Sequence, residues 1–273
     1  MADANEKERI IDEVREALSS GSGVDAILER LNQLPYYELS EIILALEPEH
    51  QVKLVSLFST DTAAGALEYL EPEHQYRILH KMSESAAVPV LNAMPSDAVV
   101  DMMVAIHPHQ AERLRSWLPA EYRKQIDELM TFPEGSAGRL ATVDYIAVRE
   151  SWTVERTLAH IRKVASEAEV VTYVYVVNAM GQLVGVVSLR QLILADPKQR
   201  ISEIVSTYVV SVSAYTGQEE AARVLSQYDF IALPVVDAKE RLIGIITVDD
   251  LFDVVEEAAT EDLQKMGGSE PLE

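Results

Sequence analysis

Cysteine is absent from the 273 residues, and basic residues are few. Without a thiol the chain cannot form disulfides, thiolate zinc sites, iron–sulfur clusters or a cysteine nucleophile, and the absence suits a reducing compartment. Lys and Arg number 23 against 45 Asp and Glu, which gives a net charge of 23 − 45 = −22 at pH 7. Such a surface repels phosphate backbones and anionic lipids, so we expect no nucleic-acid partner and favour cations instead.

Long apolar runs are also missing. No stretch of about 18 consecutive apolar residues occurs, and the first 30 residues carry no secretion signal. We therefore expect the chain as given to be soluble, neither secreted nor membrane-spanning. Motifs for acyl transfer, phosphoryl transfer and dinucleotide binding do not occur either, so we expect no enzyme. Apolar residues nevertheless make up 48% of the sequence, which is enough for a folded core.

A regular repeat extends from Pro35 to Pro119. The hexapeptide Leu-Glu-Pro-Glu-His-Gln occurs at residues 46–51 and again at 70–75, and residues that favour helix starts recur every 12 positions or so. Proline is tolerated in the first turn of a helix, while Ser, Thr and Asp favour the position before it. Helices of about nine residues are not stable alone in water. The spacing therefore predicts a superhelix of short, stacked helices, which we assign to residues 1–131.

The second half of the chain is duplicated. Residues 182–188 (QLVGVVS) and 241–247 (RLIGIIT) are related by an offset of 59, and a strand-like run and an amphipathic helix precede each copy. The pattern predicts two β-α-β-β-α units. The strand-like runs are residues 145–148 and 209–212. The predicted boundaries are a linker at 132–139 that is rich in Gly, Pro and Ser, a first unit at 140–200 and a second unit at 201–256.

Two units with this hairpin resemble a tandem pair of CBS domains. The acidic helical domain, the junction FPEGSAGRL and the tail TVDDLFDVVEEAATED together are similar to the cytosolic region of the MgtE family of magnesium channels. The resemblance implies an α plus α/β multidomain fold that ends in an acidic, amphipathic connecting helix at 250–268. It also implies a homodimer formed through the CBS domains, at the cytoplasmic face of the membrane, with a transmembrane pore domain in the full-length protein.

The tail concentrates acidic side chains. Residues 249–262 contain seven acids and no base. On a helix that turns about 100° per residue, Asp250, Asp253, Glu257 and Glu261 share one narrow stripe. Like charges at this spacing destabilise a helix, and a divalent cation would offset the repulsion. The alternative interpretation is an acidic face that only contacts solvent.

The resemblance also implies which acids bind Mg²⁺. The matching positions are Asp97, Asp229, Asp250, Asp253, Glu261 and Asp262, with Glu257 next to Ala258, where a family glutamate is missing. A second family glutamate falls on Gly65. Magnesium retains several waters and needs only one or two carboxylates, so scattered acids suit it. In that family, Mg²⁺ bound between acidic domain faces compacts the dimer and closes the pore.

Adenine nucleotides are the second ligand that the resemblance implies. Tyr173, Arg190 and Phe230 match positions that line the family's ATP site. The ribose-binding acid of the Ser/Thr-x-x-Asp motif is present in the second unit (residues 247–250) but is replaced by Gln191 in the first. Two alternatives to a magnesium sensor remain: a nucleotide-sensing CBS adaptor, and a helical scaffold that binds a protein partner.

Overall fold

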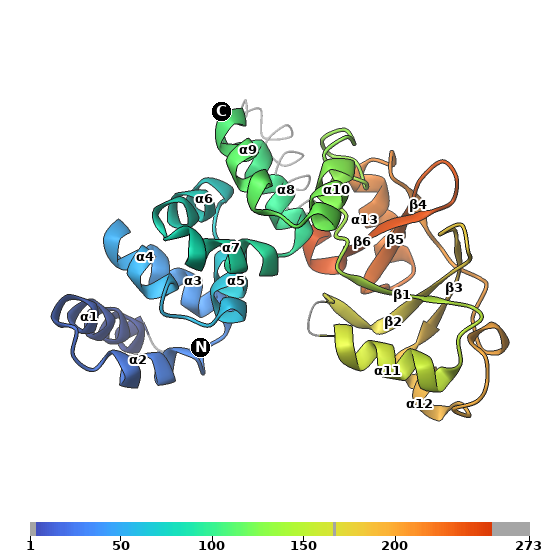
Figure 1. The fold of residues 1–273 in the computed structure, drawn as a ribbon, viewed down its shortest axis with the longest axis horizontal. Coiled ribbons are helices and arrows are strands. Elements are labelled where there is room, and N and C mark those ends of the chain that lie inside the picture. Colours follow the sequence, from blue (N-terminus) through green and yellow to red (C-terminus); the bar gives the residue numbers. More distant parts are fainter. Residues whose placement is uncertain (1–3, 166–167, 253–273) are drawn as a thin grey trace, which may run out of the picture. The chain divides into compact units, whose positions relative to one another are not determined.

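The computed structural model describes residues 4–165 and 168–252 (Figure 1). The chain divides into two compact units, residues 1–124 and 125–273. In the described ranges, no helix has both the length and the apolar character that a membrane span requires.

The first compact unit, residues 1–124, is helical. A helix of 17 residues is followed by helices of 8 to 10 residues. Their bounds are α1 Ala4–Ser20, α2 Val24–Leu31, α3 Tyr36–Leu44, α4 Pro48–Val55, α5 Thr60–Glu68, α6 Pro72–Lys81, α7 Glu84–Ala93, α8 Ser96–Ala105 and α9 Pro108–Trp117, before α10 Ala120–Leu129 leads into the second unit. From α3 to α10 every helix begins 12 residues after the previous one, as the repeat predicts.

The two copies of the hexapeptide form the same turn. The side-chain nitrogen Nε2 of Gln51 donates to the carbonyl of Leu46 at 3.0 Å, and that of Gln75 donates to the carbonyl of Leu70 at 2.8 Å. Each glutamine is buried and fixes the connection that precedes its helix. Packing alternates along the chain, since α3 contacts α5, α5 contacts α7, α4 contacts α6 and α6 contacts α8. The predicted superhelix of short helices is confirmed.

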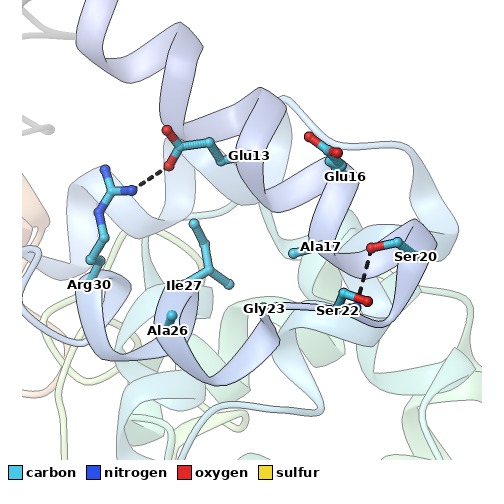
Figure 2. A pocket seen from close by; sticks show the side chains of 9 residues that line it. All are labelled: Glu13, Glu16, Ala17, Ser20, Ser22, Gly23, Ala26, Ile27 and Arg30. Carbon is cyan, nitrogen blue, oxygen red and sulfur yellow. Dashed lines mark hydrogen bonds and ion pairs between the residues drawn. The ribbon is translucent and has the colours of Figure 1, made fainter.

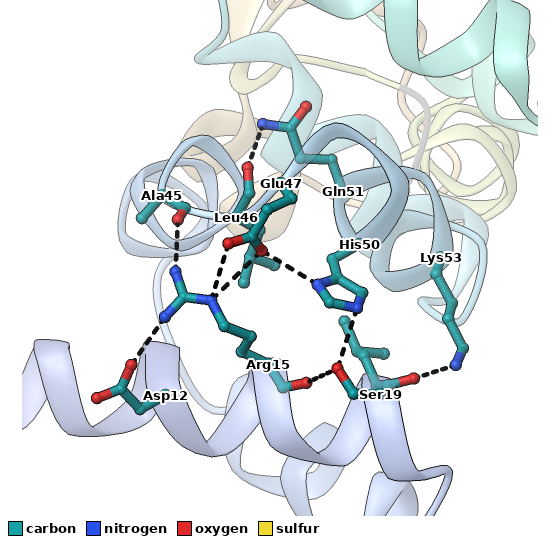
Figure 3. A network of polar contacts seen from close by, with 10 residues as sticks. Asp12, Arg15, Ser19, Ala45, Leu46, Glu47, His50, Gln51 and Lys53 are labelled. Atoms are coloured by element: carbon teal, nitrogen blue, oxygen red, sulfur yellow. Dashed lines mark hydrogen bonds and ion pairs between the residues drawn. The ribbon is translucent and has the colours of Figure 1, made fainter.

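A polar network attaches α1 to α4 (Figure 3). Arg15 on α1 pairs with Glu47 at 3.1 Å, and Glu47 also accepts from the Nδ1 atom of His50 at 3.1 Å. The Nε2 atom of His50 lies 3.3 Å from the Oγ atom of Ser19. This order of carboxylate, imidazole and hydroxyl resembles a hydrolase triad, but the Ser19 hydroxyl donates its proton to the Arg15 carbonyl at 2.7 Å. The network is therefore structural, and Lys53 extends it by donating to the carbonyl of Leu18.

The second compact unit, residues 125–273, contains two three-stranded sheets with strand orders β1-β2-β3 and β4-β5-β6. In each sheet the first two strands are parallel and the last two form an antiparallel hairpin. The helices α11 and α12 pack on the first sheet, and α13 packs on the second (Figure 1). The elements are β1 Tyr145–Arg149, α11 Val154–Val164, β2 Val170–Val177, β3 Leu183–Ser188, α12 Leu189–Leu194, a 3₁₀ turn Ile201–Glu203, β4 Val212–Ser213, α13 Gln218–Gln227, β5 Ala232–Val236 and β6 Leu242–Thr247.

Two equivalent glycines let a neighbouring backbone cross each hairpin. Thr142 pairs with Ile245 beside Gly244, and Ser206 pairs with Val186 beside Gly185. A Cβ atom at Gly244 would lie 2.8 Å from the carbonyl oxygen of Thr142, and one at Gly185 would lie 2.5 Å from that of Ser206. Because 244 − 185 = 59, the glycines confirm the duplication, and they explain why both hairpins contain glycine at this position.

One predicted strand is shorter than expected. The run 209–212 was expected to match 145–148, but β4 begins only at Val212. Val209 and Val210 instead line a cavity between aromatic side chains, described below. Upstream, segment 132–139 hydrogen-bonds to the second unit's own backbone: Ala137 donates to the carbonyl of Thr216 at 2.7 Å, and Gly138 to that of Ala214 at 2.8 Å.

Candidate functional site: an acidic cluster and an aromatic cleft

Three carboxylates from distant parts of the sequence converge in the second unit. Glu169 immediately precedes β2, whereas Asp249 and Asp250 lie in the first turn of the helix that follows β6. One carboxylate oxygen from each lies within 4.8 Å of the others. Glu169 and Asp249 are exposed and Asp250 is half-buried. We call these three residues the acidic cluster.

The backbone around the cluster is held by hydrogen bonds. The amide and the hydroxyl of Thr247 donate to Oδ2 of Asp250 at 3.1 and 2.6 Å, an arrangement that caps the helix. The amide of Glu169 donates to the carbonyl of Asp144 at 2.8 Å. Asp144 in turn accepts from the hydroxyl of Thr142 at 3.0 Å, and the backbone of Thr142 pairs with β6. One short arm, residues 142–144, thus holds the β6 end and the β2 start together.

Glu169 has a raised pKa in the acidic cluster. Shielding of the carboxyl group from water, followed by the charges of Asp250 and Asp249, raises the pKa of Glu169 to about 8. Hydrogen bonds with Thr247 and Thr142 oppose this rise. Oxygen donors that are partly open to water match the preference of Mg²⁺ for a few carboxylates and several retained waters. The donor set therefore fits a hard divalent cation.

The acids that the sequence singled out lie on different elements. Asp250 belongs to the acidic cluster. Asp229 is exposed in the turn between α13 and β5, where its φ of 52° places it in the left-handed region. Asp97 is half-buried in the first turn of α8, in the helical unit. Four further candidates lie outside the described residues: Asp253, Glu257, Glu261 and Asp262.

Glu169 was missed by reasoning from the sequence. It is far from the acidic tail in sequence, and it reaches the cluster only because β2 and β6 belong to neighbouring sheets of one unit. The duplication gave a usable signal, since position 169 corresponds to Tyr228 at the offset of 59 (228 − 59 = 169). The first β-α-β-β-α unit thus has an acid, Glu169, where the second has an aromatic residue, Tyr228.

The packing around Gly65 explains why this chain has no glutamate at a position where the resemblance implies one. The ring of Tyr36 lies against Gly65, so a Cβ atom at this position would be 2.5 Å from two ring carbons. A glutamate there would displace the tyrosine. In this chain the position is therefore filled by helix packing between α3 and α5 instead of a carboxylate.

An apolar cavity of about 110 Å³, which we call the aromatic cleft, lies between the two sheets. Tyr173 and Phe230, two of the residues assigned to a nucleotide site, both line it. Phe230 is stacked on Tyr228 with ring centres 5.4 Å apart and an interplanar angle of 14°. Burial raises the pKa of Tyr175, whose ring forms part of the wall. The remaining lining residues are Val186, Tyr208, Val209, Val210, Ala232 and Pro234.

Arg190, the third residue assigned to that site, lines a neighbouring groove at the start of α12. The groove is next to the aromatic cleft because Ser188, which also lines it, pairs with Tyr173 across β2 and β3. Arg190 is exposed, so its guanidinium is available to an anionic group of a ligand. The cleft and the groove together provide an apolar slot with a cation at one end.

A third cavity, of about 300 Å³, lies between α1 and α2 (Figure 2). Arg30 and Glu13 form an ion pair across it, and the amide of Ser22 donates to the hydroxyl of Ser20 at 3.2 Å. The cavity has only one further charged lining side chain, Glu16, and a single carboxylate does not make a cation site. It is not a candidate site.

Sequence and structural similarity place these features in a known context. Residues 34–135 match the MgtE intracellular N domain, and residues 137–198 and 201–257 match the CBS domain. The magnesium transporter MgtE of Thermus thermophilus is 39% identical over 96% of this chain and 58% of its own length. That of Bacillus subtilis is 34% identical over 88% of this chain and 53% of its own length. The chain thus spans little more than half the length of these curated relatives.

Two solved structures resemble most of the chain. The cytosolic domain of the Mg²⁺ channel MgtE in complex with ATP superposes with a TM-score of 0.81 at 38% identity, covering 89% of this chain and 99% of that one. The soluble part of a magnesium transporter superposes with a TM-score of 0.84 at 30% identity, covering 93% and 99%. The chain therefore belongs to the MgtE family of magnesium transporters, of which it comprises an N domain followed by a tandem CBS pair.

Proposed function

We propose that this chain is the Mg²⁺-sensing regulatory region of a magnesium channel or transporter, and that it acts as a homodimer and catalyses no reaction. In this proposal Mg²⁺ binds to acidic side chains and compacts the dimer, and compaction closes a transmembrane pore. The observation that carries the proposal is the convergence of Glu169, Asp249 and Asp250 within 4.8 Å.

The charge of the chain supports the same proposal. Residues 1–131 contain 11 basic and 23 acidic residues, a net −12, and residues 132–273 contain 12 and 22, a net −10. Both parts are anionic, so they repel each other until cations screen or bridge the charge. Divalent ions at carboxylates are more effective than monovalent salt because they bind at defined positions.

A sharp response requires several ions. At ten times its dissociation constant, one ion stabilises the bound state by only about 1.4 kcal/mol. Asp97 and Asp229, together with the tail acids Asp253, Glu257, Glu261 and Asp262, are proposed as further ligands. Each contributes a small increment, and their sum sets the steepness of the transition.

Small-angle X-ray scattering tests the proposal. The radius of gyration of the 273-residue chain is measured with and without Mg²⁺ at about 10 mM, a concentration suited to weak carboxylate sites. We expect Mg²⁺ to reduce it, and we expect the double variant Asp249→Asn with Asp250→Asn to need much more Mg²⁺. Glu155→Gln, an exposed acid on α11 of the same unit, is the matched control. A radius that does not respond to Mg²⁺ would contradict the proposal.

Binding of an adenine nucleotide is a second proposed function. The supporting observation is the aromatic cleft, in which Tyr173 and Phe230 face a common cavity beside Arg190. A purine ring suits such a slot, and a solved relative was crystallised with ATP. Isothermal titration with ATP, alone and with MgCl₂, separates the two ligands. Tight ATP binding without any Mg²⁺ response would favour a nucleotide-sensing adaptor instead.

A helical scaffold is the remaining alternative. It would be favoured if the shape of the chain were independent of Mg²⁺ and a protein partner bound the helical unit. Light scattering at several protein concentrations tests the homodimer directly.

A further inference from the structure

His50 has a polar partner at each of its two ring nitrogens (Figure 3). Its Nδ1 atom lies 3.1 Å from a carboxylate oxygen of Glu47, and its Nε2 atom lies 3.3 Å from the hydroxyl oxygen of Ser19. Ser19 belongs to α1, whereas Glu47 is the residue before α4 and His50 lies in its first turn. The half-buried imidazole therefore links the end of α1 to the start of α4.

The donors and acceptors of this network determine how many hydrogens the ring carries. A hydrogen bond from the backbone, followed by the one with His50, lowers the pKa of Glu47, so this side chain is a carboxylate and accepts from Nδ1. The hydroxyl of Ser19 donates its hydrogen to the carbonyl of Arg15 at 2.7 Å, so its oxygen can only accept from Nε2. Both ring nitrogens thus carry a hydrogen, which is the positively charged form of the imidazole.

Loss of one proton weakens the network in either tautomer. One nitrogen of a neutral imidazole is an acceptor only. If this nitrogen is Nε2, Ser19 must turn its hydroxyl away from the carbonyl of Arg15 in order to donate to His50. If it is Nδ1, two acceptors face each other at Glu47. In both cases the ring loses the charge that attracts the carboxylate.

Other charged groups from both helices lie around the ring. On α1, Arg15 donates to Asp12 at 2.8 Å and pairs with Glu47 at 3.1 Å. On α4, Lys53 donates to the carbonyl of Leu18. The two bases oppose protonation of the imidazole, but neither contacts it, whereas the carboxylate of Glu47 does. Among the described residues, α3 and α6, which also pack on α4, bring no charged side chain into contact with His50.

The repeat provides an internal comparison. His74 has the same position in the second copy of the hexapeptide, 24 residues after His50. Within the part of the chain that the structure describes, the side chain of His74 forms no hydrogen bond and no ion pair, although Glu71 precedes it as Glu47 precedes His50. The hexapeptide alone therefore does not create the network, which also requires α1.

We propose that His50 makes the attachment of α1 to α4 sensitive to pH. The protonated imidazole holds the C-terminal end of α1 firmly, and loss of the proton loosens it. Since imidazole groups change charge between about pH 5 and 8, the attachment should be strongest below this range and weaken as pH rises through it. Buried Val14 and Leu18 keep the helix in place at high pH, so it loosens without leaving. Neither Mg²⁺ nor a nucleotide takes part.

Hydrogen–deuterium exchange of the 273-residue chain tests the proposal. The protection of the amides of residues 17–21 is measured at pH 6 and pH 8 and corrected for the intrinsic effect of pH on exchange. We expect protection to be about fivefold lower at pH 8, the effect of one hydrogen bond. His50→Gln cannot change its charge and should remove this difference. His74→Gln, the matched control, should retain it.

A second variant keeps the proposal testable if His50→Gln disturbs the folding of the helical unit. Ser19→Ala removes the acceptor of Nε2 and leaves the imidazole in place, so the difference between pH 6 and pH 8 should become smaller. Equal protection of the unmodified chain at both pH values would overturn the proposal. A difference that persists undiminished in His50→Gln or in Ser19→Ala, or that disappears in His74→Gln, would overturn it as well.

Discussion

The two CBS units share a scaffold and differ in the side chains at equivalent positions. Both end their hairpin in a capped helix start, Ser188 to Gln191 in the first unit and Thr247 to Asp250 in the second. In the first, an amide forms the cap and the adjacent cleft is aromatic. In the second, a carboxylate forms the cap and belongs to an acidic cluster with Glu169. Duplication thus preserved the backbone contacts while the side chains at equivalent positions diverged.

Replacing the crossing glycines should have the largest effect, because it attacks what the two units share. Gly244→Ala and Gly185→Ala place a Cβ atom 2.8 and 2.5 Å from a backbone carbonyl oxygen, which must move. We expect each to lower the free energy of unfolding by about 2–4 kcal/mol in urea denaturation.

Gly217→Ala is the control for this experiment. Its φ is −65°, and the nearest atom to a new Cβ is the flexible Glu219 carboxylate at 3.6 Å. If Gly244→Ala or Gly185→Ala lowered the free energy of unfolding no more than Gly217→Ala does, close backbone approach would not explain the shared conformation at these glycines.

Neutralising the acidic cluster should change only the affinity for Mg²⁺. Asp249→Asn with Asp250→Asn removes two negative charges, while the amide oxygen introduced at position 250 can still accept the cap from Thr247. We expect Mg²⁺ affinity, measured by isothermal titration, to fall about tenfold, or about 1.4 kcal/mol. Unchanged affinity would place the Mg²⁺ ligands elsewhere.

Truncating Phe230 should lower the affinity for ATP and leave the affinity for Mg²⁺ unchanged. The variant Phe230→Ala removes one wall of the aromatic cleft and the stacking on Tyr228. We expect ATP affinity to fall about fivefold, since an aromatic contact contributes about 1 kcal/mol, while Mg²⁺ affinity stays the same. If both affinities fell together, the two sites would not be independent.

The smallest predicted effect is a pH dependence that originates at Glu169. Its folded-state pKa of about 8 lies above the ordinary 4.5, so between these values the folded chain binds more protons than the unfolded chain. Stability should therefore be full below pH 4.5, fall as pH rises toward 8, and be constant above. The residue is partly open to water although its carboxyl group is shielded, and solvent weakens the effect, so we expect a change in Tm of only a few degrees.

The difference between the chain and its variant Glu169→Gln isolates this contribution. The variant should show a weaker fall in Tm between about pH 5 and 8, and saturating Mg²⁺ should weaken the fall in the unmodified chain, because the cation replaces the proton. Identical pH profiles would show that Glu169 does not titrate in this range.

Local features of the fold were predictable from the sequence, and long-range ones were not. Helix starts followed from Pro48, Pro72 and Pro108, because proline acts on its own turn. The duplication followed from repeated hairpin residues. The role of Gly244 did not, since it depends on a segment about 100 residues away. Glu169 was missed for the same reason, and the commitment of Gln191 to its cap appeared only with the hydrogen bonds.

The alternate packing of the helical unit restricts how its length can change. Since α3 contacts α5 and α4 contacts α6, the helices form two interleaved stacks. Inserting one 12-residue segment would transfer every later helix to the opposite stack, whereas inserting 24 residues would restore each to its own. The hexapeptide recurs after 24 residues, not 12. We therefore expect length variants of this region to differ by whole pairs of helices, which makes the pair the unit of growth.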